Sequence, residues 1–255
     1  MPERKGALRP SEVPGTILGQ LNRGTLETAT LAEGLAVDFH LLLRSVAPEV
    51  NQQDAHYIKP TDGITKRMVA TGHLLLEHYG PAGFHQFAQH PSDTVRGWAA
   101  FLLASIPAMD VRDRLLQIRP LANDPHFGVR EWAWLALRPH IATHLAEAIT
   151  ILTPWAGDPG ANIRRFAIES TRPRGVWCTH IVELKQHPQR GMPLLEPLKA
   201  DMSRYVQDSV SNWLNDAAKS QPEWVRSLCE RWQQESLTPA TIRICSRAMR
   251  SVKAV

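Results

Sequence analysis

The chain has 255 residues, of which 43% are hydrophobic and 21% charged, and it carries a formal net charge of +4 with a sequence pI near 9.1. This composition excludes global disorder and is typical of a folded protein with a substantial core. No apolar run is long enough to span a bilayer, and the first 15 residues lack the apolar centre of a secretion signal. The mildly basic balance is compatible with nucleic acid as a partner, but many basic proteins bind none.

The cysteine pattern gives information about the cellular compartment. Cys178, Cys229 and Cys245 show neither a CxxC spacing nor an even number. Free thiols in a reducing cytoplasm explain this pattern better than a disulfide or zinc framework does. We therefore expect a cytoplasmic protein without a membrane partner.

The N-terminal part of the chain predicts two kinds of structure. Residues 1–25 are rich in proline, glycine and charge, and they predict a partly irregular tail. Residues 26–89 predict helices, the clearest at 65–79, which we interpret as atypical early repeats that cap one end of a single domain spanning 26–255.

Four later segments share one pattern. Each opens with a polar turn and an aspartate placed to cap a helix, and apolar residues follow an anchoring aliphatic at the helical period. The anchors are separated by 34, 34 and 43 residues. The segments are 91–103, 124–137, 158–171 and 200–214, with anchors Val95, Val129, Ile163 and Val206.

Further helical patterns lie beside these segments, and no strand pattern is present in the sequence. The additional helices are expected at 108–118, 144–153, 192–200 and 223–232. Helix pairs at periods of 34 to 43 residues predict an all-α fold, an α-solenoid of HEAT-like helical repeats with a curved concave face.

Three carboxylates interrupt the repeat pattern. Glu169 lies six residues after its anchor, where the first two repeats carry apolar residues, while Glu131 lies two residues and Asp216 ten residues after theirs. Offsets of four residues form one stripe on a helix, so stacked repeats would bring the acids together. Each acid alone is more simply explained as a solvated surface group, but clustered carboxylates repel one another and favour a functional role.

Basic residues and one tryptophan surround this stripe. Trp177 follows a helix end expected at Pro173, where an exposed indole could contact a base, although packing in the core is an equal alternative. The basic side chains could hold a phosphate backbone, or they could be solvated charges on helix surfaces. They are Arg164, Arg165, Arg172, Arg174, Lys199, Arg204 and Lys219.

Two stretches carry a family resemblance. FAIESTRPRGVW (166–177) and PLLEPLKADMSRYVQDSVSNWLNDAAKSQPEWV (193–225) resemble the AlkC branch of the AlkC/AlkD HEAT-like-repeat alkylpurine DNA glycosylases. That branch typically shows an E-G-x-R-P-R-L-P-W-like segment and then a P-L-L-x-P-L-x-D-D-x-S-x-Y-V-R-x-S-V-A-N-x-L-N-D segment. The resemblance is strong over residues 120–225, and before that only the repeat style is similar.

The resemblance implies a DNA glycosylase of base excision repair, located with the bacterial nucleoid. It would grip double-stranded DNA on the concave face and hydrolyse the N-glycosidic bond of cationic alkylated purines, chiefly 3-methyladenine, without base flipping, metal or cofactor. Carried over by residue, Glu169 and Asp216 correspond to the catalytic carboxylates, Glu131 to a supporting acid and Trp177 to the aromatic that flanks the lesion. We expect the protein to act as a monomer.

The chain departs from the family pattern at two places. Gly175 and Val176 stand where the family has Leu-Pro, which predicts a looser loop before Trp177. Gln207 and Asp208 replace a basic pair, which predicts lost phosphate contacts or charge repulsion.

Two other functions remain open from the sequence. The chain could be a HEAT-repeat scaffold that binds DNA or protein without catalysis. It could also be a metal hydrolase built on His140 and His144, whose spacing would place both imidazoles on one helix face. The second alternative lacks the glutamate that an H-E-x-x-H motif requires.

Overall fold

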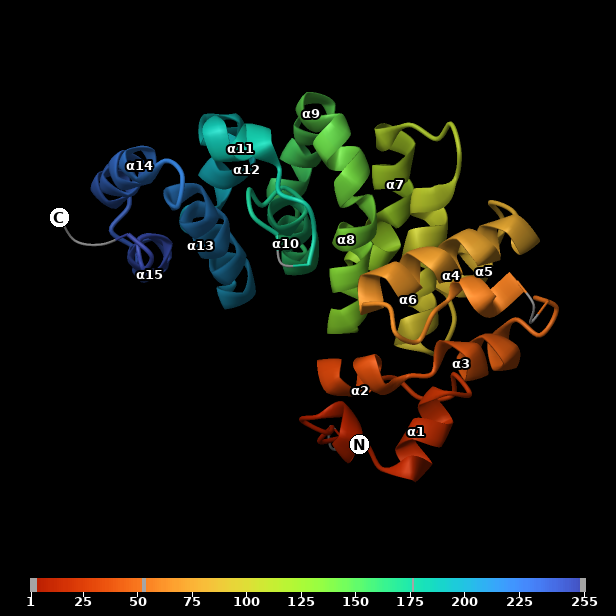
Figure 1. Cartoon of the computed structure of the whole chain (residues 1–255). Helices are drawn as coiled ribbons and strands as arrows, with labels where there is room; N and C mark the ends of the chain where they lie inside the picture. The colour runs from red at the N-terminus through yellow and green to blue at the C-terminus, as the bar shows by residue number, and fades with distance from the viewer. Residues whose placement is uncertain (1–3, 52–53, 176, 253–255) are drawn as a thin grey trace. The chain divides into compact units, whose positions relative to one another are not determined.

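The computed structural model describes residues 4–51, 54–175 and 177–252 (Figure 1). Every regular element within these ranges is an α-helix or a short 3₁₀-helix, and none is a strand. The expectation of an all-α fold built from HEAT-like repeats is confirmed. Within the same ranges, no helix has the length and apolar character needed to cross a membrane.

The chain divides into two compact units. The first comprises residues 1–109 and 124–136, and the second comprises 110–123 and 137–255. The long helix α8 (Phe127–Thr143) contributes residues to both units.

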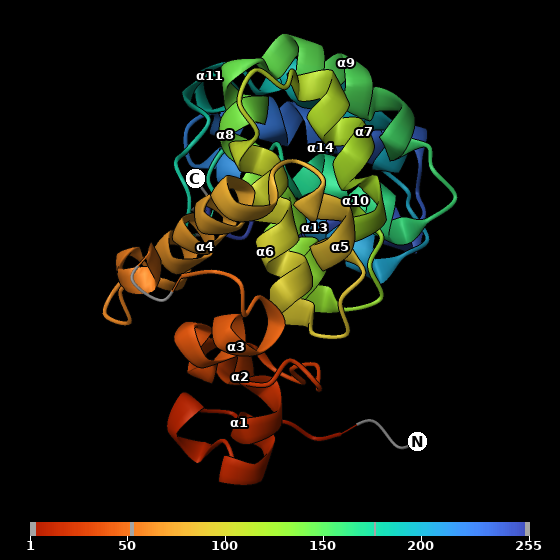
Figure 2. The ribbon, with the colours of Figure 1, turned by 90° about the vertical axis from the view of Figure 1, so that its right-hand side faces the viewer.

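The first unit is organised around helix α6, against which α4 and α5 pack (Figure 2). Gly72 of α4 permits close contact, because a Cβ atom there would lie 2.6 Å from the carbonyl carbon of Phe101. In the N-terminal segment, Arg4 donates a hydrogen bond to Glu33 at 2.6 Å. The elements are η1 (Pro10–Glu12), α1 (Gly15–Leu21), α2 (Leu31–Ala36), α3 (Phe39–Val46), η2 (Asp54–Tyr57), α4 (Ile64–Tyr79), α5 (Gly83–Ala88) and α6 (Asp93–Ser105).

The second unit is a row of stacked helices, in which α10 packs against α9 and α13, and α13 packs against α14 and α15 (Figure 1). The helix expected at 192–200 is interrupted, because Pro197 has no N–H to continue the α-helical hydrogen bonds. The elements are α7 (Val111–Ala122), α9 (Leu145–Ala156), α10 (Ala161–Glu169), α11 (Val182–Gln186), η3 (Pro188–Gly191), α12 (Met192–Leu195), η4 (Glu196–Leu198), α13 (Arg204–Ala218), α14 (Pro222–Glu235) and α15 (Pro239–Ala248).

The aspartates that open the repeats form hydrogen bonds and ion pairs with neighbouring residues. The expectation that they cap the next helix is wrong for α10 and α13, whose N-cap residues make no side-chain cap. Instead, Asp158 and Asp201 each accept a hydrogen bond from the backbone N–H two residues later, at 2.7 and 2.8 Å. Each also pairs with an arginine of an adjoining helix, Arg119 for Asp158 and Arg164 for Asp201. The aspartates therefore join neighbouring repeats.

Arg164 is the clearest link between two repeats. Its Nε lies 2.6 Å from Asp201 Oδ2, and its Nη1 donates to the carbonyls of Asp158 and Pro159 at 2.8 and 2.9 Å. Arg96 makes the same kind of contacts in the first unit. Because the Arg164 guanidinium is engaged in this way, we do not propose it as a phosphate contact.

Replacing Arg164 with alanine is expected to destabilise the fold by roughly 3 kcal/mol, because the buried Asp201 carboxylate loses its partner. Urea unfolding measures this change. The matched control is Arg112→Ala on the exposed side of α7, for which we expect a change of less than about 0.5 kcal/mol. Equal stability of the two variants would contradict the structural role of Arg164.

Candidate functional site

The two carboxylates singled out from the sequence lie together in the second unit. Glu169 is the last residue of α10, Asp216 lies in the last turn of α13, and the guanidinium of Arg172 joins them. Arg172 Nη1 donates to Glu169 Oε2 at 3.2 Å, while Nε and Nη2 lie 2.9 and 2.8 Å from Asp216 Oδ2. Glu169 is only 3% exposed and Asp216 only 4%. The sequence-based expectation that these two acids meet agrees with this geometry.

Further polar groups complete the surroundings of each carboxylate. Ser209 Oγ donates a hydrogen bond to Glu169 Oε1 at 2.7 Å, and Nη2 of Arg165 lies 3.6 Å from the same oxygen. Asp216 Oδ1 is less engaged, with Lys219 Nζ at 3.6 Å. Three cations thus surround two carboxylates.

Burial affects the ionisation of Asp216. Loss of solvation raises the pKa of its carboxyl group, while Arg172 and Lys219 act in the opposite direction without cancelling the shift. The Asp216 carboxylate is therefore a stronger base than an exposed aspartate.

A buried arginine fixes the chain segment that follows α10. Arg138, in the last part of α8, is 2% exposed and donates to the carbonyl oxygens of Ser170 at 3.1 Å, Thr179 at 3.3 Å and Arg172. These three hydrogen bonds anchor both ends of the loop at residues 173–178, because two of the carbonyl groups precede the loop and one follows it. α10 itself ends at Glu169, before Pro173, where the sequence predicted the helix end, and the loop follows.

The loop presents Trp177 to solvent in an unusual backbone conformation. Trp177 has φ of 63° and is 58% exposed. A left-handed conformation is uncommon for a bulky residue and costs free energy, so such residues are enriched at functional sites. Trp177 is therefore an exposed indole rather than a core residue.

Gly175 accounts for one departure from the family pattern. A Cβ atom at this position would lie 2.0 Å from Cys178 Sγ and 3.3 Å from the Arg138 guanidinium. Leucine, the family residue, cannot occupy this position in the present loop. The loop is built around the Cys178 sulfur, and the adjoining Val176 lies outside the described residues.

The predicted phosphate contacts differ in how accessible they are. Arg204 and Lys219 are exposed at the two ends of α13. Lys199 instead lies between two carboxylates, at 2.9 Å from Glu196 and 2.5 Å from Glu235. Of these three cations, Arg204 and Lys219 are better placed to meet a phosphate.

The other predicted cations have partners within the second unit. The Arg165 guanidinium stacks over the Tyr205 ring, 4.3 Å from its centroid. Arg174 donates to Ser220 Oγ at 2.7 Å. Arg172, predicted as a phosphate contact, is instead engaged by the two carboxylates.

Glu131 belongs to the first unit, where its Oε2 accepts a hydrogen bond from Trp134 Nε1 at 2.9 Å. That it joins the other two carboxylates stays a prediction.

Several residues near the site were not selected from the sequence. The sequence does not single out Arg138, because an arginine in a helical segment is usually a surface residue. Ser209 belongs to no motif that would indicate a role. Arg243 lies 2.6 Å and Arg247 3.4 Å from Asp208 Oδ1, so the acid that departs from the family pattern is charge-compensated.

The two histidines considered as metal ligands do not share one helix. α8 ends at Thr143, and His144 is the N-cap of α9 with φ of −114° and ψ of 45°. The expectation that His140 and His144 lie on one helix face is therefore wrong. In the described ranges, no three His, Cys, Asp or Glu side chains are grouped so that they could hold a metal ion.

The repeats and the helix stacking define an α-solenoid of HEAT-like repeats, and a family model described as HEAT repeats matches residues 81–172. The sequence-based resemblance to the AlkC/AlkD-like proteins is confirmed at the level of the structure. The chain is similar to the Pseudomonas fluorescens alkylpurine DNA glycosylase AlkC bound to DNA containing an abasic-site analogue. The identity is 26% and the TM-score 0.65, covering 82% of this chain and 60% of that one.

Other similar proteins extend this comparison. AlkD2 from Streptococcus mutans shares the fold at 21% identity with a TM-score of 0.62, covering 82% of this chain and 100% of that one. Bacillus subtilis YhaZ, an uncharacterised protein, is 42% identical over 64 residues, which are 25% of this chain and 18% of YhaZ. The chain thus spans less than two thirds of the length of AlkC and of YhaZ.

The backbone at Trp177 gives a stability prediction. Trp177→Gly is expected to be more stable than Trp177→Ala by about 1 kcal/mol, because glycine adopts a positive φ without strain and alanine does not. Both variants lose the indole, so urea unfolding of the pair isolates the backbone effect. An alanine variant as stable as the glycine variant would rule out the left-handed conformation.

Proposed function

We propose that the chain is a DNA glycosylase of base excision repair that removes cationic alkylated purines, chiefly 3-methyladenine, from double-stranded DNA. The observation that carries the proposal is the pair of buried carboxylates, Glu169 and Asp216, joined by Arg172, together with the exposed indole of Trp177 on the loop that follows Arg172. The structural similarity to AlkC supports the same conclusion. The identity of 26% over 82% of this chain supports a shared class of reaction.

The proposed chemistry requires little acid catalysis. An N3-alkylated adenine is already cationic, so its departure needs no proton, and positive charge then develops on the deoxyribose. A carboxylate near C1′ stabilises this charge and accepts a proton from the attacking water. The new bond joins the water oxygen to C1′, and the neutral base leaves with the electrons of the N-glycosidic bond.

We assign the main role to Asp216 and a supporting role to Glu169. Both oxygens of Glu169 accept hydrogen bonds, from Ser209 and Arg172, whereas Asp216 Oδ1 is contacted by Lys219 at the longer distance of 3.6 Å. Asp216 Oδ1 is thus the carboxylate oxygen best able to receive a proton. The raised pKa of its carboxyl group strengthens it as a base.

The positive groups around the carboxylates would bind the phosphates of the damaged strand. Lys219 and Arg204 are exposed on α13, and the Arg165 guanidinium stacks on Tyr205 nearby. Cations of this kind hold the backbone without reading the sequence, which suits an enzyme that must search for lesions. Trp177 would then contact the damaged nucleotide through its ring face.

A second candidate is a DNA-binding repeat protein without catalysis. The near-complete burial of both carboxylates favours it, since Arg172 already compensates their charge. In that case the cluster would serve only to join α10 to α13. The two candidates differ in whether free base is released.

Asp216→Asn is expected to slow the release of 3-methyladenine by about 100-fold, and Glu169→Gln by about 10-fold, since electrostatic groups in active sites contribute on this scale. Single-turnover assays on methylated duplex DNA at saturating protein measure the rates. With Asp216 acting as the carboxylate, the wild-type rate falls as pH drops through its raised pKa, and Asp216→Asn loses this dependence.

The control is Asp113→Asn, which makes the same substitution at an exposed position of α7. We expect its rate to match that of the wild type. DNA affinity is measured in parallel. Wild-type protein that binds DNA but releases no base would favour the binding-only candidate, and full activity in Asp216→Asn would overturn the assignment.

A further inference from the structure

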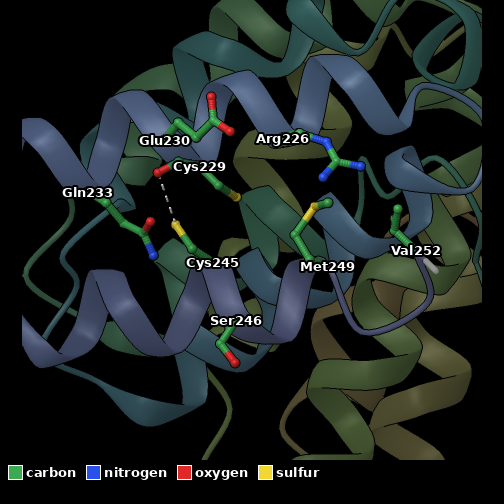
Figure 3. Close-up of a pocket in the computed structure, with 8 residues that line it drawn as sticks. All are labelled: Arg226, Cys229, Glu230, Gln233, Cys245, Ser246, Met249 and Val252. Atoms are coloured by element: carbon green, nitrogen blue, oxygen red, sulfur yellow. Dashed lines mark hydrogen bonds between the residues drawn. The ribbon is translucent and has the colours of Figure 1, made fainter. Parts of the chain in front are cut away.

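The C-terminal helix pair contains a second set of reactive groups, separate from the carboxylate site. Cys229 of α14 and Cys245 of α15 line a pocket of about 360 Å³ together with Met249 (Figure 3). Figure 3 shows both thiols between the two helices, on the side of the pocket. Neither cysteine has a role in the proposed glycosylase reaction.

The two cysteines lie close together across the helix pair. The Cys245 thiol donates a hydrogen bond to the backbone carbonyl oxygen of Cys229, with Sγ 3.7 Å from that oxygen. Cys229 is 5% exposed and Cys245 2%, so packing holds both in place. Since α14 and α15 are consecutive and pack together, the two residues face each other at similar distances from the connecting loop.

The contact makes the two sulfurs chemically unequal. The neighbouring Cys229 side chain lowers the pKa of Cys245, while the neighbouring Cys245 side chain and burial raise the pKa of Cys229. Since the thiolate is the nucleophile, Cys245 is the sulfur that reacts first.

We propose that Cys229 and Cys245 form a reversible redox site, in which a peroxide oxidises the dithiol to a disulfide that links α14 to α15. The pocket gives a small oxidant a route to both sulfurs. This inference does not depend on the proposed DNA glycosylase function.

The reaction balances with hydrogen peroxide as the oxidant. The Cys245 thiolate attacks one peroxide oxygen, which breaks the O–O bond and gives a sulfenic acid and, after proton transfer, one water. The Cys229 sulfur then attacks the Cys245 sulfur, and the sulfenic oxygen leaves as a second water. Two thiols are oxidised to one disulfide while one peroxide is reduced to two waters, and a dithiol reductant reverses the change.

The disulfide would fix the position of α15. This helix carries Arg243 and Arg247, which pair with Asp208 of α13. A covalent link from α14 restricts the unfolded chain and holds the arginine-bearing helix in place.

The test treats the full chain with hydrogen peroxide, quenches and denatures it, and alkylates the remaining thiols before mass spectrometry. We expect an intramolecular disulfide between Cys229 and Cys245, removed by dithiothreitol, with Cys178 still alkylated. The oxidised protein should unfold at a temperature higher by about 5–10 °C, as expected for closing a loop of this size.

The controls separate the pair from the third cysteine. Cys178→Ala should retain the disulfide and the thermal shift, whereas Cys229→Ala and Cys245→Ala should lose both. If a variant fails to fold, peptide mapping of the oxidised wild-type protein still identifies the linkage. The proposal is overturned if both thiols remain open to alkylation, if the bond includes Cys178, or if it joins two chains.

Discussion

The contact of one guanidinium with two buried carboxylates is the interaction on which the candidate site depends. Arg172 follows α10 directly and reaches both Glu169 of that helix and Asp216 of α13. Two carboxylates with almost no exposure are costly to keep ionised without such a partner. Because a buried ion network is weak evidence for added stability, its presence favours a role in function.

The rest of the site supports this contact. Arg138 binds the carbonyl groups of Ser170 and Arg172, so a buried arginine fixes the backbone from which the Arg172 side chain extends. Ser209 restrains the other oxygen of Glu169. The loop that carries Trp177 begins in the same segment and fits closely around the Cys178 sulfur. A change in this segment would therefore move the indole and the carboxylates together.

The fold could be predicted from the sequence because HEAT-like repeats combine a regular helical period with a regular spacing of helix pairs. The meeting of Glu169 and Asp216 followed from the same regularity, since an offset of four residues keeps two side chains on one helix face. The prediction that the opening aspartates cap the following helices was wrong for α10 and α13. A single sequence does not distinguish an aspartate that caps a helix from one that pairs with an arginine of a neighbouring repeat.

The functions of individual arginines were harder to predict. A sequence gives the charge of Arg164, Arg172 and Lys199 but not their partners, and all three pair with carboxylates. Arg138 was missed because its partners are backbone carbonyls, which leave no mark in the sequence. The exposure of Trp177 and the lack of room for a side chain at Gly175 depend on the conformation of the loop. A loop has no periodic sequence pattern from which its conformation could be predicted.

The most direct test of the central claim is the single-turnover release of 3-methyladenine by the Arg172→Gln variant, compared with the wild type at saturating protein. If Arg172 positions Glu169 and Asp216, the wild type releases the base, while the variant binds DNA almost as tightly but loses most of its release rate. If the variant binds DNA weakly and still releases the base at the full rate once saturated, Arg172 is a phosphate contact, and its positioning of the two carboxylates is contradicted.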